Sequence, residues 1–494
     1  MWLKLDGEGP AYRQVYRALR VRIASGELRA GAKLPPTREL AAELGLSRTT
    51  VLQAYDQLSA EGFIAGRTGS GSYVEALPEP RARKAEGRNV AHARDAALEL
   101  SSFGDALARR KSRPFFGSYV SERPTLRYDF RYGRPSIVDV PVRAWQRCLG
   151  RRARAASVRA HDYGHPRGSA ALRDVLAEYL GRARGVATDA DHIIVVTGSQ
   201  QALDLAARIL IEPGDVAVVE DPGYEGARRA FEAAGARLAF APVDAQGLDT
   251  DSLAGLARRA KLAHVTPSHQ YPLGGVMPYP RRRALLDWAK RAGAHVIEDD
   301  YDGEYRFEGR PLEALKALDE QERVLYVGTF SKVMFPALRV GYVVVPDSLV
   351  EVFTRAKALA DGGGPLLEQD ALADFIASGE FERHIRRSRS RYAERRSALL
   401  KALEGSFGDR IEVYGAEAGL HLTIRLKDKL NRPMRELVAQ ATEVGLGIYP
   451  ADGYYSRPPR APTLVLGYTS LAPQDIREGV RRLAKLLEEY SVTH

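Results

Sequence analysis

A lysine near residue 330 has neighbours that favour chemistry with an aldehyde. Thr329-Phe330-Ser331-Lys332 follows a short apolar run, and Arg339 comes soon after it. A lysine at a strand end, partly removed from water and close to a cationic arginine, has a lowered pKa, and its neutral amine can form an imine with an aldehyde. Taken singly, Lys332 also fits an ordinary surface lysine.

A second segment places three acids together. In Val296-Ile297-Glu298-Asp299-Asp300-Tyr301 the acids directly follow an apolar run, at the edge where open α/β sheets bind ligands. One carboxylate beside a heterocyclic nitrogen would keep that nitrogen protonated, because the ion pair stabilises the charged form. Metal binding and ordinary acidic loop residues are the alternatives. No Cys cluster accompanies the acids, and the neighbouring histidines lack metal-ligand spacing, so we predict no metal site. These histidines are His161, His165, His264 and His269.

The third segment is Thr197-Gly198-Ser199-Gln200-Gln201, which follows an apolar run and opens a helical stretch. Free backbone N–H groups and the positive end of a helix converge at such a turn and can bind an anion. By itself the segment also fits a plain strand-to-helix turn. Pyridoxal phosphate requires a phosphate cradle, a partner for its pyridinium nitrogen and a Schiff-base lysine. The three segments together therefore favour this cofactor.

The elements that must position these residues alternate in type. Short β-branched runs separated by helical stretches predict a largely parallel sheet covered by helices. The runs are His192–Thr197, Val216–Glu220, Leu262–Thr266, His295–Glu298, Val324–Gly328 and Arg339–Val344. The last 120 or so residues shift to longer helices, near 380–403 and 473–490, with short strands near 419–425 and 464–468. This pattern predicts a smaller C-terminal α+β subdomain.

The first 75 residues follow a different pattern, which predicts a winged helix-turn-helix. An amphipathic helix covers Ala11–Ser25; Thr37 caps a short helix that Gly45 ends, and Ser47 caps another that ends near Gly62. Two short strands then follow, Phe63-Ile64 and Ser72-Tyr73-Val74, joined by a glycine-rich turn with a basic tip.

The helix after Ser47 begins with side chains suited to the major groove of DNA. Arg48 can reach a guanine or a phosphate, and Thr49 and Thr50 can contact phosphates or a thymine methyl. Gln53 lies about one turn further along the same helix. The remaining candidates are Arg38 over the backbone, and Arg67 and Gly69 in the wing. A three-helix interaction module with ordinary surface arginines is the alternative.

Length and composition bound the rest of the interpretation. The 494 residues suggest two or three folding units, and 45% hydrophobic with 28% charged residues can bury a sizeable core. No apolar run is long enough to span a membrane, the start lacks the features of a secretory signal, and Cys148 is the single cysteine. We therefore expect a cytoplasmic protein with no membrane partner. The net charge of +10 does not by itself choose a partner.

Residues 10–75 resemble the GntR-type winged-helix family. The resemblance is carried by Leu34-Pro35-Pro36-Thr37-Arg38-Glu39-Leu40-Ala41, Leu46-Ser47-Arg48-Thr49-Thr50-Val51 and Gly69-Ser70-Gly71-Ser72-Tyr73-Val74. It implies that residues 1–75 bind double-stranded DNA. The contacts would come from Arg38, Ser47, Arg48, Thr49, Thr50 and the Gly66–Gly71 wing. Residues 76–124, which are rich in proline and basic residues, are predicted to be a linker.

Residues 125–494 resemble fold type I aminotransferases over about 125–490. The resemblance implies that Lys332 carries the Schiff base, that Asp299 pairs with the pyridine nitrogen and that Tyr301 hydrogen-bonds the ring oxygen. The phosphate would be held by Arg339, Ser331, Ser199 and Gln200. Tyr224, in Glu220-Asp221-Pro222-Gly223-Tyr224, is similar to the aromatic residue that stacks on the cofactor ring. Tyr163, in Tyr163-Gly164-His165-Pro166-Arg167-Gly168, is similar to the tyrosine that reaches the phosphate of the neighbouring subunit.

Two departures from the aminotransferase pattern limit what can be carried over. His269-Gln270-Tyr271-Pro272-Leu273-Gly274 stands where many members have Asn-Pro-x-Gly, so the usual ring-oxygen asparagine is missing. Val465 stands where many have an arginine for the substrate carboxylate. The candidate substitutes for that arginine are Arg228, Arg457 and Arg460.

A GntR-type reader joined to an aminotransferase-like domain resembles the MocR subfamily of pyridoxal-phosphate-dependent transcription regulators. This resemblance implies a head-to-tail homodimer, operators with repeated half-sites, and an amine or amino-acid effector that binds as a Schiff base; RNA polymerase is a further candidate partner. An active aminotransferase that carries a DNA tether is the alternative function. A degenerate dimerisation scaffold without cofactor is a third possibility.

Overall fold

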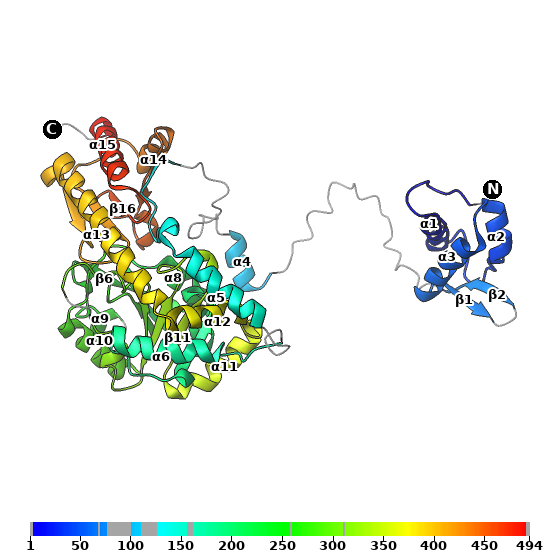
Figure 1. The fold of residues 1–494 in the computed structure, drawn as a ribbon, viewed down its shortest axis with the longest axis horizontal. Coiled ribbons are helices and arrows are strands. Elements are labelled where there is room, and N and C mark those ends of the chain that lie inside the picture. Colours follow the sequence, from blue (N-terminus) through cyan, green and yellow to red (C-terminus); the bar gives the residue numbers. More distant parts are fainter. Residues whose placement is uncertain are drawn as a thin grey trace. The chain divides into compact units, whose positions relative to one another are not determined.

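The computed structural model of the chain describes residues 3–67, 70–76, 100–109, 126–155, 162–256, 259–309 and 312–490. It divides into two compact units, Met1–Arg109 and Arg110–His494 (Figure 1). Most of the predicted linker lies outside the described residues. Its described part contains one helix, α4 (Ser102–Arg109).

The N-terminal unit begins with three helices followed by a β-hairpin. The helices are α1 (Ala11–Ala24), α2 (Thr37–Leu44) and α3 (Arg48–Ala60), and the hairpin is β1 (Ile64–Arg67) paired antiparallel with β2 (Gly71–Val74). The apolar face of α1 is buried against α3, as its periodicity predicts. The Tyr55 hydroxyl on α3 donates a hydrogen bond of 2.8 Å to the Pro35 carbonyl, which fixes α3 against the segment that enters α2.

The ends of the two central helices differ in how they are capped. The Ser47 side chain accepts a 3.1 Å hydrogen bond from the Thr50 amide and caps α3, as the sequence predicts. The prediction that Thr37 caps α2 is wrong, because Thr37 is already the first helical residue and Pro36 takes the cap position without a side-chain bond. Gly45 ends α2 in the left-handed conformation with φ 66°.

Replacing the cap residue tests how much it contributes to the reader. Ser47→Ala removes the bond to the Thr50 amide and is expected to cost about 1 kcal/mol, which makes the α3 amide protons exchange about fivefold faster. Hydrogen exchange on the full chain measures this change. Ser59→Ala, an exposed position late in the same helix, is the matched control and should leave exchange nearly unchanged. Equal exchange in the two variants would contradict a stabilising role for the cap.

The large unit is built on an eight-stranded sheet with the order β4-β11-β10-β9-β8-β5-β6-β7. Its strands are β4 (Ile193–Val196), β5 (Val216–Asp221), β6 (Arg237–Asp244), β7 (Gly247–Leu248), β8 (Ala260–Val265), β9 (His295–Asp300), β10 (Val324–Thr329) and β11 (Gly341–Val344). The pairs among β6, β5, β8, β9 and β10 are parallel, and β11 is antiparallel to both β10 and β4. The predicted α/β fold with a largely parallel sheet is confirmed.

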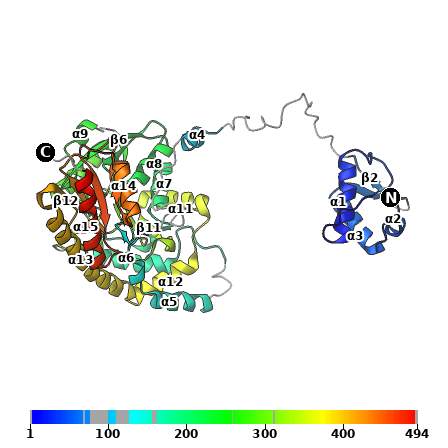
Figure 2. The same ribbon diagram turned by 90° about the horizontal axis from the view of Figure 1, so that it is seen from above.

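Helices cover both faces of this sheet, because alternate strand residues point to opposite sides. Ile297 and its neighbours on one face pack against α7 (Ser199–Leu210), α8 (Glu225–Ala233) and α11 (Asp347–Asp361). The opposite face packs against α10 (Tyr279–Ala292) toward β8 and against α6 (Ala170–Arg184) toward β4. Three further helices are α5 (Val142–Ala155), α9 (Leu253–Leu256) and α12 (Leu366–Ala377), of which α5 packs on α12 (Figure 2).

A smaller α+β subdomain follows the sheet, as predicted. Its four-stranded antiparallel sheet has the order β12-β13-β16-β15, from β12 (Ile411–Tyr414), β13 (His421–Leu426), β15 (Tyr449–Pro450) and β16 (Thr463–Gly467). The long helix α13 (Glu380–Phe407) lies beside α15 (Pro473–Tyr490), and α14 (Met434–Glu443) packs on α15 (Figure 1). A short parallel pair, β3 (Tyr128–Asp129) with β14 (Leu446–Gly447), joins the start of the large unit to this subdomain. Over the described parts of the chain, no helix has the length and apolar character needed to cross a membrane.

Candidate cofactor site and nucleic-acid interface

The three polar segments meet at one edge of the large sheet. β4, β5, β8, β9 and β10 all run in the same direction, so the loops that follow them leave the sheet at the same edge. β11 runs the other way, so Arg339, which comes before it, also lies at this edge. Strand direction explains why residues more than a hundred positions apart converge.

Lys332 follows β10 and extends into the large unit. Its Nζ donates a 2.7 Å hydrogen bond to the Gly133 carbonyl. Removal from water lowers the pKa of Lys332 to about 8, while the carboxylates of Asp302 and Asp299 oppose that shift. The Gly133 carbonyl therefore holds an amine that becomes neutral close to physiological pH, within the electrostatic influence of two carboxylates.

Asp299 is buried, with 4% of its surface exposed. Its Oδ2 lies 3.4 Å from Nε2 of His264, and its Oδ1 has no hydrogen-bond partner among the described residues. A buried carboxylate oxygen without a partner is costly, and a bound N–H donor would remove that cost. The site thus offers an acceptor for a protonated ring nitrogen.

The two acids beside Asp299 belong to the opposite face of the sheet. All three acids are the last three residues of strand β9, rather than part of the loop after it. Asp300 forms a buried ion pair of 2.6 Å with Arg184. Glu298 accepts hydrogen bonds from the Leu315 and Lys316 amides, and burial together with the charge of Asp300 raises the pKa of Glu298 to about 7. Only the middle acid of the three therefore faces the residues that surround Lys332.

An anion-binding cradle forms where β4 leads into α7. Gly198 is the N-cap residue of α7, with φ 123°, and it has no side chain that could bond the first backbone N–H groups of the helix. These N–H groups point out of the N-terminal end of α7, where an anion can bind. A Cβ on Gly198 would lie 3.2 Å from Nη2 of Arg339, which places the guanidinium directly against this turn. Ser199 and Gln200 are the first two residues of the helix. Helix end and arginine together can hold a phosphate.

Aromatic residues border the same space. The Tyr224 hydroxyl donates to Oε1 of Gln200 at 3.3 Å, and the Tyr224 ring lies 6.1 Å from that of His264 at an angle of 33°. The Tyr301 hydroxyl lies 3.0 Å from Nδ1 of His269. Ser331 is buried, and its amide donates to the Thr329 hydroxyl. Among the described residues, no hydrogen bond or ion pair joins the Ser331 side chain to this cradle.

A buried network missed by the sequence interpretation lies behind Tyr301. His269 Nδ1 is 3.1 Å from Oδ2 of Asp302, and the ring of His421 from β13 lies 5.0 Å from that of His269. Donor atoms of His269, Asp302 and His421 lie within 4.8 Å of one another, a metal-ligand set that sequence spacing could not reveal. One of these atoms, Nδ1 of His269, already contacts the Tyr301 hydroxyl as well as Asp302. Burial and the neighbouring His269 lower the pKa of His421 to about 3, so that imidazole is neutral.

The residues considered as binders of a substrate carboxylate are not positioned together for that role. Val465 is fully buried within β16, where it pairs with Thr423 on β13. Arg228 is buried too, and its Nη2 donates to the Glu220 and Tyr454 carbonyls and to Asp221. Both of the other candidates, Arg457 and Arg460, are exposed.

Tyr163 also stands apart from the cradle. Its side chain is 94% exposed within the single chain, and over the described residues no hydrogen bond or ring contact joins it to Arg339 or to the start of α7.

The predicted DNA-contacting side chains lie on the N-terminal unit. Arg38, Arg48, Thr49, Gln53 and Arg67 are all exposed. The guanidinium of Arg67 lies over the Tyr73 ring, 4.8 Å from its centre. The hydroxyls of Ser47 and Thr50 bond each other at 2.7 Å, so they first serve the start of α3. Gly69 lies outside the described residues.

Comparisons with known proteins agree with this division of the chain. Residues 11–74 match the model of bacterial regulatory proteins of the gntR family, and residues 128–478 match that of aminotransferase class I and II. The chain is 38% identical over 487 residues to a probable rhizopine catabolism regulatory protein, MocR, of Rhizobium meliloti, covering 97% of this chain and 94% of that one. It is 32% identical to the HTH-type transcriptional regulator TauR of Rhodobacter capsulatus, with 98% of each covered.

A solved structure supports the fold of the large unit. The kynurenine aminotransferase of Pyrococcus horikoshii, determined in complex with PMP, superposes with a TM-score of 0.72 and is 29% identical. The match covers 80% of this chain and 98% of the enzyme. The two regulators align with nearly the whole chain, whereas the enzyme aligns with 80% of it. The chain therefore belongs to the MocR family of GntR-type regulators, in which a winged helix-turn-helix precedes an aminotransferase class I and II domain.

Proposed function

We propose that this chain is a pyridoxal-phosphate-dependent, DNA-binding transcriptional regulator. The observation that carries the proposal is the pairing of Lys332, with its lowered pKa, and the buried, unpartnered Oδ1 of Asp299 at one sheet edge. Neither feature is needed to bind DNA. Both match a cofactor that has an aldehyde and a basic ring nitrogen.

The described residues fit such a cofactor. Lys332 would form the covalent link, Asp299 would keep the ring nitrogen protonated, and Arg339 with the first turn of α7 would bind the phosphate. Tyr224 would stack on the ring, and Tyr301 would donate to the ring oxygen, held in place by His269. The bound cofactor supplies an electrophilic carbon for an amine. Ser331 remains a predicted phosphate contact.

The N-terminal unit would read the operator. The start of α3 presents exposed Arg48 and Thr49 as a recognition helix does, and Arg67 lies on the hairpin that would form the wing. We propose that Arg38 contacts the phosphate backbone and that Gln53 lies within reach of the bases. Gly69 in the wing and RNA polymerase as a partner stay predictions.

A homodimer is part of the proposal. Tyr163 exposes 94% of its side chain, which is unusual for a large aromatic residue and is explained if it reaches the phosphate of a second copy. Two readers in one head-to-tail dimer would require an operator with two half-sites. Cytoplasmic location stays an expectation.

Effector binding fits this pocket better than rapid turnover of common amino acids. Val465 is buried in β16, and Arg228 is held by backbone carbonyls, so neither can bind an α-carboxylate as the usual arginine does. We propose that an amine or amino acid, bound to the cofactor in place of the Lys332 amine, changes the population of two forms of the large unit, as an effector with unequal affinity for them must. An active aminotransferase is the second candidate, and steady-state conversion at ordinary enzyme rates would favour it.

Promoter binding tests the regulatory proposal. The full chain is titrated onto the DNA upstream of its own gene, with and without pyridoxal phosphate, in the wild type and in Lys332→Ala. We expect the cofactor to change the affinity by a factor of about 5 to 150 in the wild type, the usual range of allosteric coupling, and to leave the variant unchanged. Equal affinity in all four conditions would exclude control of DNA affinity by the cofactor.

A further inference from the structure

Two neighbouring helices of the large unit carry an unusual concentration of arginine. The segment α5 contains five arginines and no acidic residue. Residues 383–396 of α13 contain seven arginines and a single acidic residue, Glu394. The proposed cofactor chemistry uses none of these side chains. Arginine clustered along helices is the electrostatic pattern of a surface that binds nucleic acid.

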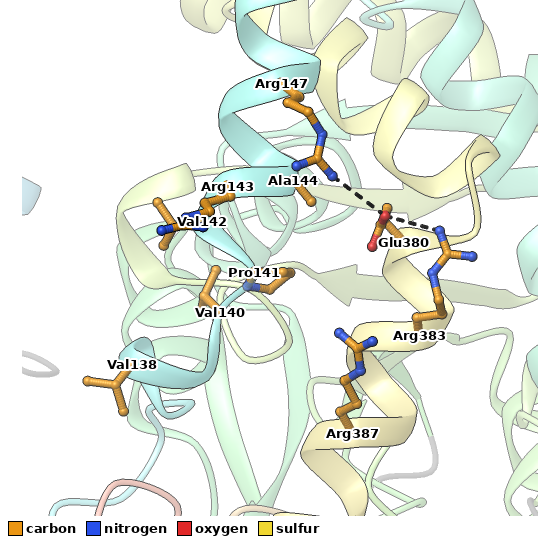
Figure 3. Close-up of a pocket in the computed structure, with 10 residues that line it drawn as sticks. All are labelled: Val138, Val140, Pro141, Val142, Arg143, Ala144, Arg147, Glu380, Arg383 and Arg387. Atoms are coloured by element: carbon orange, nitrogen blue, oxygen red, sulfur yellow. Dashed lines mark ion pairs between the residues drawn. The ribbon is translucent and has the colours of Figure 1, made fainter.

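The starts of the two helices face each other across a groove. Figure 3 shows Arg143 and Arg147 on α5 opposite Arg383 and Arg387 on α13. The pocket between them has a volume of about 570 Å³. Its one acidic residue is Glu380, so the lining carries four arginines against one carboxylate. The remaining lining residues are Val138, Val140, Pro141, Val142 and Ala144.

The positive charge in this groove is only partly compensated, because Glu380 is the one carboxylate that faces the four arginines. Oε1 of Glu380 lies 3.1 Å from Nη2 of Arg383 and 3.8 Å from Nη2 of Arg147, so one carboxylate forms ion pairs with two arginines. Arg143 and Arg387 are exposed and have neither an ion pair nor a hydrogen bond with any described residue. Elsewhere on the same helices arginines have acidic partners. Asp374 accepts from Arg152, and Asp139 accepts from Arg391.

We propose that this groove binds the phosphate backbone of DNA, so that the large unit contacts DNA as well as the reader. The guanidinium group is planar and matches phosphate oxygens through two parallel hydrogen bonds, and it is more weakly hydrated than an ammonium group, so less hydration is lost when it meets a phosphate. Positions four residues apart on one helix, such as Arg383 and Arg387, are about 6 Å apart along its axis and can contact successive phosphates. The inference rests on the proposed DNA-binding function, because the reader is what brings DNA to the chain.

Exposed Val138 and Val142 border the groove and carry no charge. They would accommodate an apolar surface of a protein partner, but the charge ratio of the lining favours a polyanion. Contacts to phosphates are independent of sequence and release counterions, so they weaken steeply with salt. This property gives the groove a measurable signature.

The test uses the full chain with Arg143→Glu and Arg387→Glu together, titrated onto a long duplex of unrelated sequence at several salt concentrations. We expect the affinity at low salt to fall by at least about tenfold and the slope of log K against log salt to decrease by about 2, since two phosphate contacts are lost. The promoter fragment should show the same decrease in slope. A variant with Arg143→Gln and Arg387→Gln removes the two charges without reversing them. It should lose less affinity than the glutamate variant but show the same decrease in slope.

The matched control is Arg435→Glu with Arg477→Glu, two exposed arginines on α14 and α15 without described partners, which should leave the slope unchanged. An unchanged slope in the groove variant, with wild-type binding intact, would overturn this inference but leave the reader and the proposed function standing. Equal losses of affinity in the groove and control variants would also overturn the inference, because the loss would then come from the changed net charge and not from the groove. Failure of the wild type to bind any DNA would overturn both proposals.

Discussion

Replacing Lys332 with alanine is expected to abolish the covalent retention of pyridoxal phosphate. The amine of Lys332 donates to the Gly133 carbonyl, and removal from water lowers its pKa to about 8. Other lysines have different environments: Lys357, for example, forms an ion pair of 2.6 Å with Asp361. Borohydride reduction of the loaded protein, followed by peptide mass spectrometry, should find the cofactor on residue 332 in the wild type and on no peptide in the variant.

The control for this experiment is Lys290→Ala, which removes an exposed lysine from α10. It should retain the cofactor in full. Labelling of Lys332→Ala at wild-type stoichiometry would contradict the assignment. Non-covalent binding should survive in part, because Arg339 and the first turn of α7 do not depend on the lysine.

The same lysine gives a pH dependence whose sign follows from the neutral amine being the nucleophile. With a pKa of about 8, roughly a quarter of the Lys332 side chains are neutral at pH 7.5, compared with about one in a thousand at the ordinary value. The initial rate of cofactor attachment should therefore rise as the pH increases and level off above about 8. Stopped-flow absorbance at limiting cofactor measures it. A rate that continues to rise tenfold per pH unit up to pH 10 would contradict a lowered pKa.

Local patterns predicted the reader and the strands well. The apolar face of α1, the cap at Ser47 and the glycine at 45 are all short-range features, and the structure has them. Strand β6 was missed, because its side chains are mostly half-exposed and its pattern lacks the apolar run of a buried strand. Arg339 was placed in a strand, whereas β11 begins at Gly341 after a left-handed turn at Arg339.

The site was harder to predict where it depends on distant contacts. Sequence could indicate that one of three adjacent acids meets a ring nitrogen, but the partner of Asp300 is Arg184, more than a hundred residues earlier. The network of His269, Asp302 and His421 joins two subdomains, and nothing in their spacing indicates it. Pairings of this kind follow from the direction of the strands and from the packing of β13 over the sheet edge.

Arg48→Ala is expected to reduce affinity for the promoter by about 5- to 150-fold, the cost of one lost base or phosphate contact of 1–3 kcal/mol. Arg48 is exposed at the first position of α3, and its backbone is held by the cap at Ser47. Fluorescence anisotropy on the promoter fragment and on an unrelated duplex separates two roles. Loss of a base contact lowers the affinity for the promoter only. Loss of a phosphate contact lowers the affinity for both duplexes and reduces the salt slope by about 1.

Arg13→Ala is the matched control, since Arg13 is an exposed arginine on α1, outside the helix-turn-helix, and its removal changes the net charge equally. If both variants lose the same affinity, the effect is long-range charge, and α3 would not be the recognition helix. If Arg48→Ala alone weakens the promoter complex and cofactor retention is unchanged, reading and cofactor binding are separable. The recognition helix would then read the operator without contributing to the cofactor site.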